Sequence, residues 1–392
     1  MASVLRRVGI SAGILGAIAL VFLAGAVTSA FAIRSSVQRY WTVMTEPRTP
    51  NAVNFAGYVT IGGVQQWITI RGKDRNNPVL LHLHGGPGTA VSDISYTVFS
   101  ALEDAFVLVQ WDQRGAGRSN VEPDKLLPTM TYDRLVEDGS EVLAYLQKRF
   151  GRQKILVFGQ SWGTVLGLGL AKRHPEQIAA YLAVGQFNNL SAMAVTTVAE
   201  SRKEADRRGE TLMVAQLNRV GPMPATIYDQ HGISNGALSN WIDSIQTSGA
   251  KLGQHWYKRT EDDMNAFFTA AALMSPSVTN AEVFRVLFGK APDGRPVAQL
   301  TAGLAAWDGV TISGGQLAVP YILMMGKHDN QTPLADAKLL YHAIEAPFKH
   351  YVELPYAAHY VWPEQPGLAF YELTKELIPF ALPAAGPGWV AP

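Results

Sequence analysis

The sequence contains no cysteine. This absence excludes disulfide bonds, thiolate metal sites and a cysteine nucleophile, although it says little about the cellular compartment. Charged residues are also scarce, at 17% of the 392 residues, and the net charge is only +1. Without a clustered basic face or a nucleic-acid-binding motif, the sequence indicates no nucleic-acid partner.

A long stretch without charge lies near the N-terminus. Residues 8–33 contain no charged side chain and follow Arg6 and Arg7. This run exceeds both the ~20 residues that span a bilayer and the ~7–15 residues of a signal-peptide core. We therefore predict a membrane anchor within residues 1–33, with the rest of the chain outside the cytoplasm. The alternative is a signal peptide cleaved near residues 30–32, which would give a secreted or periplasmic protein.

The remainder of the chain divides into four segments by its pattern. Residues 34–50 show no periodicity and predict a linker. Residues 51–187 alternate strand and helix patterns, residues 188–316 are helical and rich in Met, Trp and Phe, and residues 317–392 resume the alternation. This order predicts an α/β fold in which a mostly parallel sheet, covered by helices on both faces, is interrupted by an inserted helical cap.

Individual elements can be assigned within these segments. The pair Gly62-Gly63 lies between two strand patterns and can take the positive φ of a tight turn, so residues 58–70 predict a hairpin. Apolar runs and helical spacing predict strands at 78–83, 106–111, 179–184, 321–325 and 351–354, and helices at 131–150, 333–345 and 365–378.

The segment 154–166 carries the motif on which the functional interpretation depends. It begins with an apolar run that predicts a buried strand and continues with a helical pattern. Between them, Gly159 and Gly163 flank Ser161 in a Gly-x-Ser-x-Gly motif, which places a serine on a strained strand-to-helix turn. The motif alone often arises by chance, but its place between a strand and a helix predicts that Ser161 is a nucleophile.

A serine nucleophile needs a base, and the base needs a carboxylate that orients it. In doubly wound hydrolases the acid and then the histidine follow the serine along the chain. Asp329 comes just after the strand 321–325, and His359 lies in the loop after the last strand, so we predict them as acid and base. The alternatives are a turn or capping role for Asp329, a surface role for His359, and His328 as base; Thr332 is expected to cap the next helix.

Donors for the developing oxyanion are expected on two segments. One is the backbone N–H of Trp162, directly after the nucleophile. The other lies in the loop 84–88 (HGGPG), where bare glycines let N–H groups approach a carbonyl. We favour Gly86 as this donor, with Gly85 as the alternative donor and a substrate-binding position. His84 is interpreted as a structural residue that hydrogen-bonds its own loop, and this chemistry requires no metal or cofactor.

Taken together, the motifs resemble the proline iminopeptidase family of α/β-hydrolases. The resemblance covers residues 54–187 and about 318–380 and implies the α/β-hydrolase fold with a helical cap. It also implies a triad of Ser161, Asp329 and His359, oxyanion donors at Gly86 and Trp162, and removal of an N-terminal residue, typically proline, from peptides. The motifs are HGGPG at 84–88, WDQRGAGRS at 111–119 and GQSWG at 159–163.

Within the motif at 111–119, Asp112, Arg114 and Arg118 are interpreted as a structural network of ion pairs and turns near the edge of the active site. Most cap aromatics are expected to pack together and some to face substrate, with Trp241 and Trp256 as our substrate-binding candidates.

The chain departs from the family in two respects, of which the smaller is Gln160 in place of the small residue usual before the serine. The family recognises the substrate amine with cap glutamates, one of which typically follows a tryptophan, and this chain has no Trp-Glu pair. An esterase or amidase acting on small apolar substrates is therefore the second hypothesis. A membrane-tethered binding protein without turnover is the third. A serine at position 161 argues against the epoxide hydrolases and dehalogenases of this fold, which need a carboxylate nucleophile.

Overall fold

An eight-stranded sheet forms the centre of the computed structural model, which describes residues 2–258, 260–289 and 291–381. Its strand order is β1-β2-β4-β3-β5-β6-β7-β8. The pairs β1–β2 and β2–β4 are antiparallel, and all the other neighbouring pairs are parallel. The strands are β1 (Val53–Ile61), β2 (Val64–Gly72), β3 (Val79–Leu83), β4 (Val107–Trp111), β5 (Ile155–Gln160), β6 (Ile178–Val184), β7 (Tyr321–Gly326) and β8 (Lys349–Leu354).

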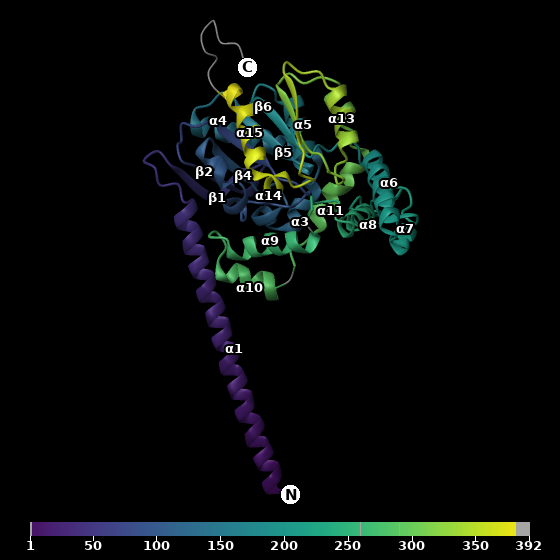
Figure 1. Cartoon of the computed structure of the whole chain (residues 1–392). Helices are drawn as coiled ribbons and strands as arrows, with labels where there is room; N and C mark the ends of the chain where they lie inside the picture. The colour runs from purple at the N-terminus through teal and green to yellow at the C-terminus, as the bar shows by residue number, and fades with distance from the viewer. Residues whose placement is uncertain (1, 259, 290, 382–392) are drawn as a thin grey trace. The chain divides into compact units, whose positions relative to one another are not determined.

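Helices cover both faces of this sheet (Figure 1). Successive residues of β3 alternate between two apolar clusters: Leu81 belongs to the cluster beneath α4 (Tyr132–Phe150), α5 (Trp162–Arg173) and α13 (Leu334–Ala343), and Leu80 to the cluster beneath α15 (Pro366–Ala381). The central strands β3 to β7 are therefore buried on both sides, as is typical of parallel strands. The predicted α/β fold is confirmed. Three short helices, α2 (Ser95–Val98), α3 (Pro123–Leu126) and α14 (Val361–Glu364), complete this part.

Local sequence explains where several elements begin and end. Gly62 and Gly63 form the two-residue turn of the predicted hairpin, with φ of 55° and 75°, and the flanking residues Ile61 and Val64 pair with each other. Thr131 caps α4, since its side chain accepts a hydrogen bond from the third residue of the helix.

The segment between β6 and β7 is helical, as predicted, and contains no strand in its described residues. Its helices are α6 (Leu190–Arg208), α7 (Thr211–Leu217), α8 (Ala237–Lys251), α9 (Glu261–Met274), α10 (Asn280–Phe288), α11 (Arg295–Ala302) and α12 (Gly309–Ser313).

By its internal contacts the chain forms two compact units. One unit contains Met1–Glu46 and Thr269–Ala291, and the other contains Pro47–Phe268 and Pro292–Pro392. The helical insertion is thus shared between the two units, and the boundaries 188–316 of a separate cap remain a prediction. The predicted second core segment extends to residue 392, but residues 382–392 lie outside the described part.

The N-terminal helix α1 (Ala2–Thr45) is longer than the sequence indicated. The segment 34–50 was expected to have no regular structure, and this is wrong up to Thr45. The reason is tertiary: Arg34 and Gln38, one helical turn apart, donate hydrogen bonds to backbone carbonyls of residues 273–278. Residues 17–45 of α1 are long and apolar enough to cross a membrane, and only 6% of the apolar window is buried. A signal sequence would meet the same criteria.

The motif at 111–119 does form ion pairs, but with partners outside the motif. Arg114 lies in the core, where its guanidinium makes two hydrogen bonds, of 2.6 and 2.9 Å, to the carboxylate of Asp138 on α4. Arg118 pairs with Asp93, and its backbone N–H donates to Asp112 at 3.0 Å. Burial raises the pKa of Asp112 to about 7. The expected structural role of the motif is confirmed.

The Arg114–Asp138 pair yields a prediction about stability. Both side chains are almost completely buried, so Asp138→Asn would leave a buried guanidinium without its counter-charge. We expect this change to lower the free energy of unfolding by about 3–5 kcal/mol, measured by urea denaturation of the detergent-solubilised protein. Asp133→Asn is the matched control, because Asp133 is 74% exposed and pairs with Arg173 at the surface; its loss should cost about 0–1 kcal/mol. Equal effects of the two changes would contradict this interpretation.

Candidate active site

The backbone of Ser161 is strained. Its φ of 54° and ψ of −121° lie outside the regions that non-glycine residues prefer, and it occupies the turn between β5 and α5. Although Ser161 takes the N-cap position of α5, its side chain makes no capping hydrogen bond. The hydroxyl is therefore left unused by the helix, and strain of this kind is typical of functional sites.

The two glycines of the motif are required by close backbone contacts. A Cβ on Gly159 would overlap with the carbonyl of Gly163, and a Cβ on Gly163 would overlap with the carbonyl of Leu83 at the end of β3. Both obstacles are backbone atoms, which cannot rotate out of the way as a side chain can. The Gly-x-Ser-x-Gly spacing is thus a steric condition for seating α5 against the sheet.

Asp329 and His359 are in direct contact. Asp329 Oδ2 lies 2.9 Å from His359 Nδ1, and both side chains are almost fully buried. A carboxylate at this nitrogen favours the tautomer that carries its proton on Nδ1, which leaves Nε2 free to act as a base. The structure therefore brings together the predicted acid and the predicted base.

Thr332 was expected to cap the following helix, and this is wrong. The N-cap position of α13 is Pro333, which makes no side-chain capping bond. Thr332 instead donates two hydrogen bonds of 2.8 Å to Asp329, from its backbone N–H to Oδ1 and from its hydroxyl to Oδ2. The N–H of Gln331 also donates to Oδ1 at 2.9 Å. Asp329 thus organises its own turn and orients His359 at the same time.

Strand β6 separates the serine from this pair. The N–H of Ser161 donates to the carbonyl of Val184 at 2.9 Å, and the next residue, Gly185, faces the imidazole. A Cβ on Gly185 would lie 3.0 Å from His359 Cε1, so glycine makes room for the ring. Among the described residues, Ser161 forms hydrogen bonds only through its backbone, and the His359 ring only through Nδ1. The serine–histidine hydrogen bond is therefore not formed in this structure, and such bonds often tighten only when substrate binds.

The predicted oxyanion donors face one cavity. Gly86 and Trp162 line it together with Ser161. Neither backbone N–H donates a hydrogen bond to any described residue, so both are available to a ligand. Gly86 has a φ of 116°, which a residue with a side chain rarely adopts. This arrangement fits the predicted role of both groups.

His84 and Gln113 fix the loop that carries Gly86. The N–H of Gln113 donates to His84 Nε2 at 3.2 Å, so Nδ1 carries the proton and donates to the carbonyl of Gly85 at 2.8 Å. Burial lowers the pKa of His84 to about 4, which keeps the ring neutral, and its expected structural role is confirmed. Gln113 also accepts a hydrogen bond of 2.9 Å from the indole N–H of Trp162. Sequence analysis missed Gln113, although it lies within the motif at 111–119.

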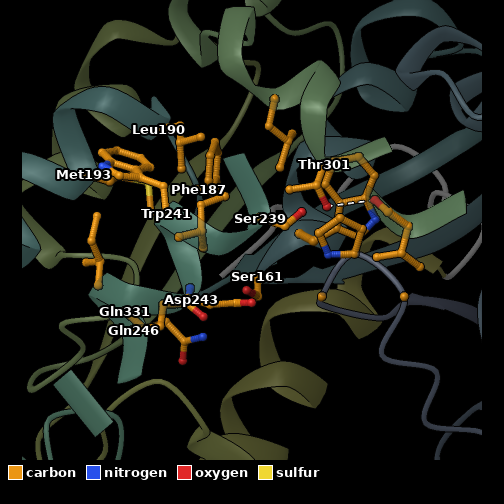
Figure 2. Close-up of a pocket in the computed structure, with 18 of the residues that line it drawn as sticks. Ser161, Phe187, Leu190, Met193, Ser239, Trp241, Asp243, Gln246, Thr301 and Gln331 are labelled. Carbon is orange, nitrogen blue, oxygen red and sulfur yellow. Dashed lines mark hydrogen bonds between the residues drawn. The ribbon is translucent and has the colours of Figure 1, made fainter. Parts of the chain in front are cut away.

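The cavity has a volume of about 540 Å³ and is lined by the loop 86–89, the serine turn and the helices α6, α8 and α11. Figure 2 shows two groups of side chains around Ser161: the apolar Phe187, Leu190, Met193 and Trp241, and the polar Asp243, Gln246 and Gln331. The cavity therefore combines an apolar wall with a polar one.

The three predicted substrate-binding residues lie in different places. Trp241 lines the cavity. Gly85 does not line it but passes close to Ser161, since a Cβ on Gly85 would lie 3.3 Å from the Cβ of Ser161. Trp256 is buried and stacks on Tyr360 at 4.1 Å between ring centroids, outside the cavity lining.

Asp243 is the only carboxylate among the described residues that line the cavity. It lies on α8, two residues after Trp241, and its side chain is exposed. Sequence analysis did not single out this aspartate. The available signal was the helical phase, because positions 239, 242, 243 and 246 recur at intervals of three and four and share one face of α8.

The remaining alternatives do not form a second centre. His328, the weaker candidate base, is exposed and stacks on Tyr257 at 4.7 Å. Within the described part of the chain, no group of three or more His, Asp or Glu side chains is placed to hold a metal ion.

Comparison with known proteins agrees with this geometry. A family model described as the α/β hydrolase fold matches residues 78–219. A probable aminopeptidase of Bacillus subtilis is 27% identical over 321 residues, which cover 81% of this chain and 94% of that protein. The proline iminopeptidase of Neisseria gonorrhoeae is 35% identical over 135 residues, which cover 34% of this chain and 40% of that enzyme.

Solved structures give the same fold. The proline iminopeptidase-related protein of Thermus thermophilus superposes with a TM-score of 0.59 at 20% identity, covering 84% of this chain and 99% of that one. The proline iminopeptidase of Mycobacterium smegmatis gives a TM-score of 0.57 at 19% identity, covering 84% of this chain and all of that one. The chain thus has the α/β-hydrolase fold, resembles proline iminopeptidases and is a hydrolase, which sets aside the hypothesis of a binding protein without turnover.

The strained turn at Ser161 predicts selective chemical labelling. We expect a fluorophosphonate probe to label the protein and Ser161→Ala to abolish the labelling, because Ser161 occupies the strained turn between the predicted oxyanion donors and the predicted base His359. In-gel fluorescence measures the result. Ser239→Ala is the control, since Ser239 lines the same cavity from α8 and should leave labelling unchanged. Persistent labelling of Ser161→Ala would exclude Ser161 as the nucleophile.

Proposed function

We propose that this hydrolase is a serine aminopeptidase of the proline iminopeptidase type, with Ser161, His359 and Asp329 as its catalytic triad. The contact between His359 Nδ1 and Asp329 Oδ2 supports the proposal most directly, because it holds a buried imidazole in the tautomer that a base needs. The strained turn of Ser161, next to that imidazole across Gly185, supports it independently.

In this mechanism, Ser161 Oγ attacks the substrate carbonyl carbon while His359 Nε2 accepts the hydroxyl proton. The N–H groups of Gly86 and Trp162 then donate to the oxyanion, and one such donor is worth about 2.7–4 kcal/mol in comparable enzymes. His359 returns the proton to the leaving amine, which breaks the scissile bond and leaves an acyl-enzyme. Water activated by the same imidazole hydrolyses this ester and regenerates Ser161.

Asp243 is our candidate for recognising the free N-terminus of the peptide. An ammonium group that enters a partly apolar cavity loses hydration and needs a counter-charge. Asp243 supplies a carboxylate on the wall of the cavity that contains Ser161, and the apolar side chains of Phe187, Leu190 and Trp241 suit a small apolar first residue such as proline. The cap carboxylate would thus be an aspartate on α8 where the family uses glutamates.

The second candidate function is an esterase or amidase for small apolar substrates. The exposure of Asp243 favours it, because a carboxylate in contact with water binds an ammonium group only weakly. Both functions use the same triad and differ only in whether a charged amine is recognised.

Asp243→Asn separates the two functions. For an aminopeptidase we expect kcat/KM on proline 2-naphthylamide to fall about tenfold, equivalent to about 1.4 kcal/mol of lost binding to the amine, with p-nitrophenyl butyrate hydrolysis unchanged. Both rates are followed by product absorbance or fluorescence. Asp262→Asn is the matched control, since Asp262 is an exposed aspartate outside this cavity. Ester turnover without any release of proline by the wild-type protein would discard the peptidase proposal in favour of the esterase.

We further propose that α1 is retained as a membrane anchor, with the catalytic residues outside the cytoplasm. The helix is unbroken through residues 30–32, where a signal peptidase would have to cut, and Phe31 stacks against Phe284 of α10. Cleavage there would require both the helix and this contact to open. The large apolar side chains of α1 between residues 18 and 27 are exposed and do not pack into a protein core. An apolar surrounding such as a lipid bilayer would therefore stabilise this part of the helix.

Retention of α1 is tested on the mature protein. We expect N-terminal sequencing of the membrane fraction to begin at or near residue 1, because the helix and its packing protect residues 30–32. A soluble form that begins close to Ile33 would show instead that the segment is a cleaved signal peptide.

A further inference from the structure

We propose that α10 is an interfacial helix that lies on the membrane beside α1 and inserts Phe284, Leu287 and Phe288 into the lipid. This proposal rests on the proposed retention of α1. It concerns a surface that the hydrolytic mechanism does not use.

The apolar face of α10 is open to its surroundings. Phe284, Leu287 and Phe288 follow one another at the spacing of neighbours on a single helical face, and all three are exposed. The rings of Phe284 and Phe288 are 4.9 Å apart, so they form one continuous patch. Of the apolar residues of this helix, Val283 is the buried one, on the inner side. Large exposed aromatic side chains gathered on one face indicate an apolar partner.

Two contacts fix the level at which α10 meets α1. Phe284 stacks on Phe31, with ring centroids 6.5 Å apart and planes nearly parallel. One turn further along α1, Arg34 donates to Asn280, the first residue of α10, and to the carbonyl of Val278. Helix α10 therefore lies beside residues 31–34, as Figure 1 shows for these two helices.

Residues 31–34 are also the point at which α1 would leave a bilayer. The uncharged run ends at Ile33, and the ~20 residues needed to cross the hydrocarbon core fit within the preceding part of it. Tyr40 and Trp41 follow about two turns later, and these aromatic types gather at the membrane–water interface. A helix attached at residues 31–34 thus lies at the boundary between headgroups and acyl chains, where amphipathic interfacial helices bind.

The occupant of the patch is a lipid surface because the patch is continuous with the exposed side of α1. Phe31 joins the two: it belongs to the apolar run and touches the α10 face. Two polar groups of this region are held away from the patch: Arg34 is buried among carbonyl and amide oxygens, and Glu282 is engaged in a capping box with Thr279. Arg285 is exposed on the flank of α10, about 60° from Phe288 around the helix. The three positions that would enter the lipid carry no charge themselves, and the long Arg285 side chain can reach the headgroups from the flank.

The natural absence of cysteine makes a direct test possible, because one introduced cysteine is the only labelling site. The full-length protein is reconstituted in phosphatidylcholine–phosphatidylglycerol vesicles, with a single cysteine carrying the fluorophore NBD. Phe288→Cys tests the patch. Val286→Cys is the matched control, since the two side chains are equally exposed, at 73% and 74%, and lie about 160° apart around the helix. Val21→Cys, in the middle of the apolar run, reports whether α1 itself is inserted. Unchanged fluorophosphonate labelling shows that each variant is folded.

We expect NBD at position 288 to emit at shorter wavelength and to be quenched several-fold more than NBD at 286 by lipids that carry a nitroxide near the headgroup. NBD at position 21 should be quenched best by nitroxides deep in the acyl chain. Quenching at 21 without quenching at 288 would overturn the proposal while leaving the anchor in place. Loss of quenching at all three positions would overturn the anchor and the interfacial helix together. A third outcome is a blue shift at position 288 that appears only at high protein concentration and is not affected by the lipid quenchers. That result would assign the patch to a contact with a second copy of the chain, and it would also overturn the proposal.

Discussion

The close packing of Gly163 against the backbone carbonyl of Leu83 is the contact on which the rest of the site depends. It sets α5 directly against the end of β3, and Ser161, on the turn that leads into α5, has a strained backbone conformation. Because β3 continues into the loop that contains Gly86, the same contact also fixes the distance between the serine turn and that loop. One close backbone contact thus helps to place the proposed nucleophile and both proposed N–H donors.

The rest of the site follows from the order of the strands. The carboxyl ends of β4, β3 and β5 supply Gln113, Gly86 and Ser161, while β7 and β8 lead to Asp329 and His359 on the other side of β6. In a parallel sheet these ends lie at the same edge. Residues more than 200 positions apart in the chain, such as Gly86 and Asp329, are therefore brought to the same edge by the topology of the sheet alone. Side chains then hold the arrangement in place. Gln113 joins the loop that contains Gly86 to Trp162, and Thr332 holds Asp329 in its turn.

The features that depend on local sterics and periodicity could be predicted from the sequence. The predictions were wrong or incomplete where a residue's role depends on partners far away in the chain. The strands and the Ser161 turn could be predicted because buried strands require apolar runs and the tight turn requires glycines. Thr332 was assigned to the next helix because a Thr-Pro pair favours a cap, yet Asp329 competes for the same hydroxyl and N–H groups. Gln113 acts through His84, in the loop after β3, and Trp162, on α5. Residues 34–45 are helical because of contacts with carbonyls more than 200 residues away. Such partners leave no local pattern.

Arg34 shows how the N-terminal helix and the insertion are joined. A guanidinium buried at the end of an apolar run is costly unless acceptors surround it. The carbonyl of Leu273, in the last turn of α9, is one such acceptor at 2.8 Å, and carbonyls at a helix end lack partners of their own. The cation also suits the negative end of the α9 dipole. Each group therefore satisfies a requirement of the other, so removal of Arg34 would leave the carbonyl of Leu273 without this donor and would also remove the hydrogen bonds to Asn280 and Val278 that help to hold α10 beside α1.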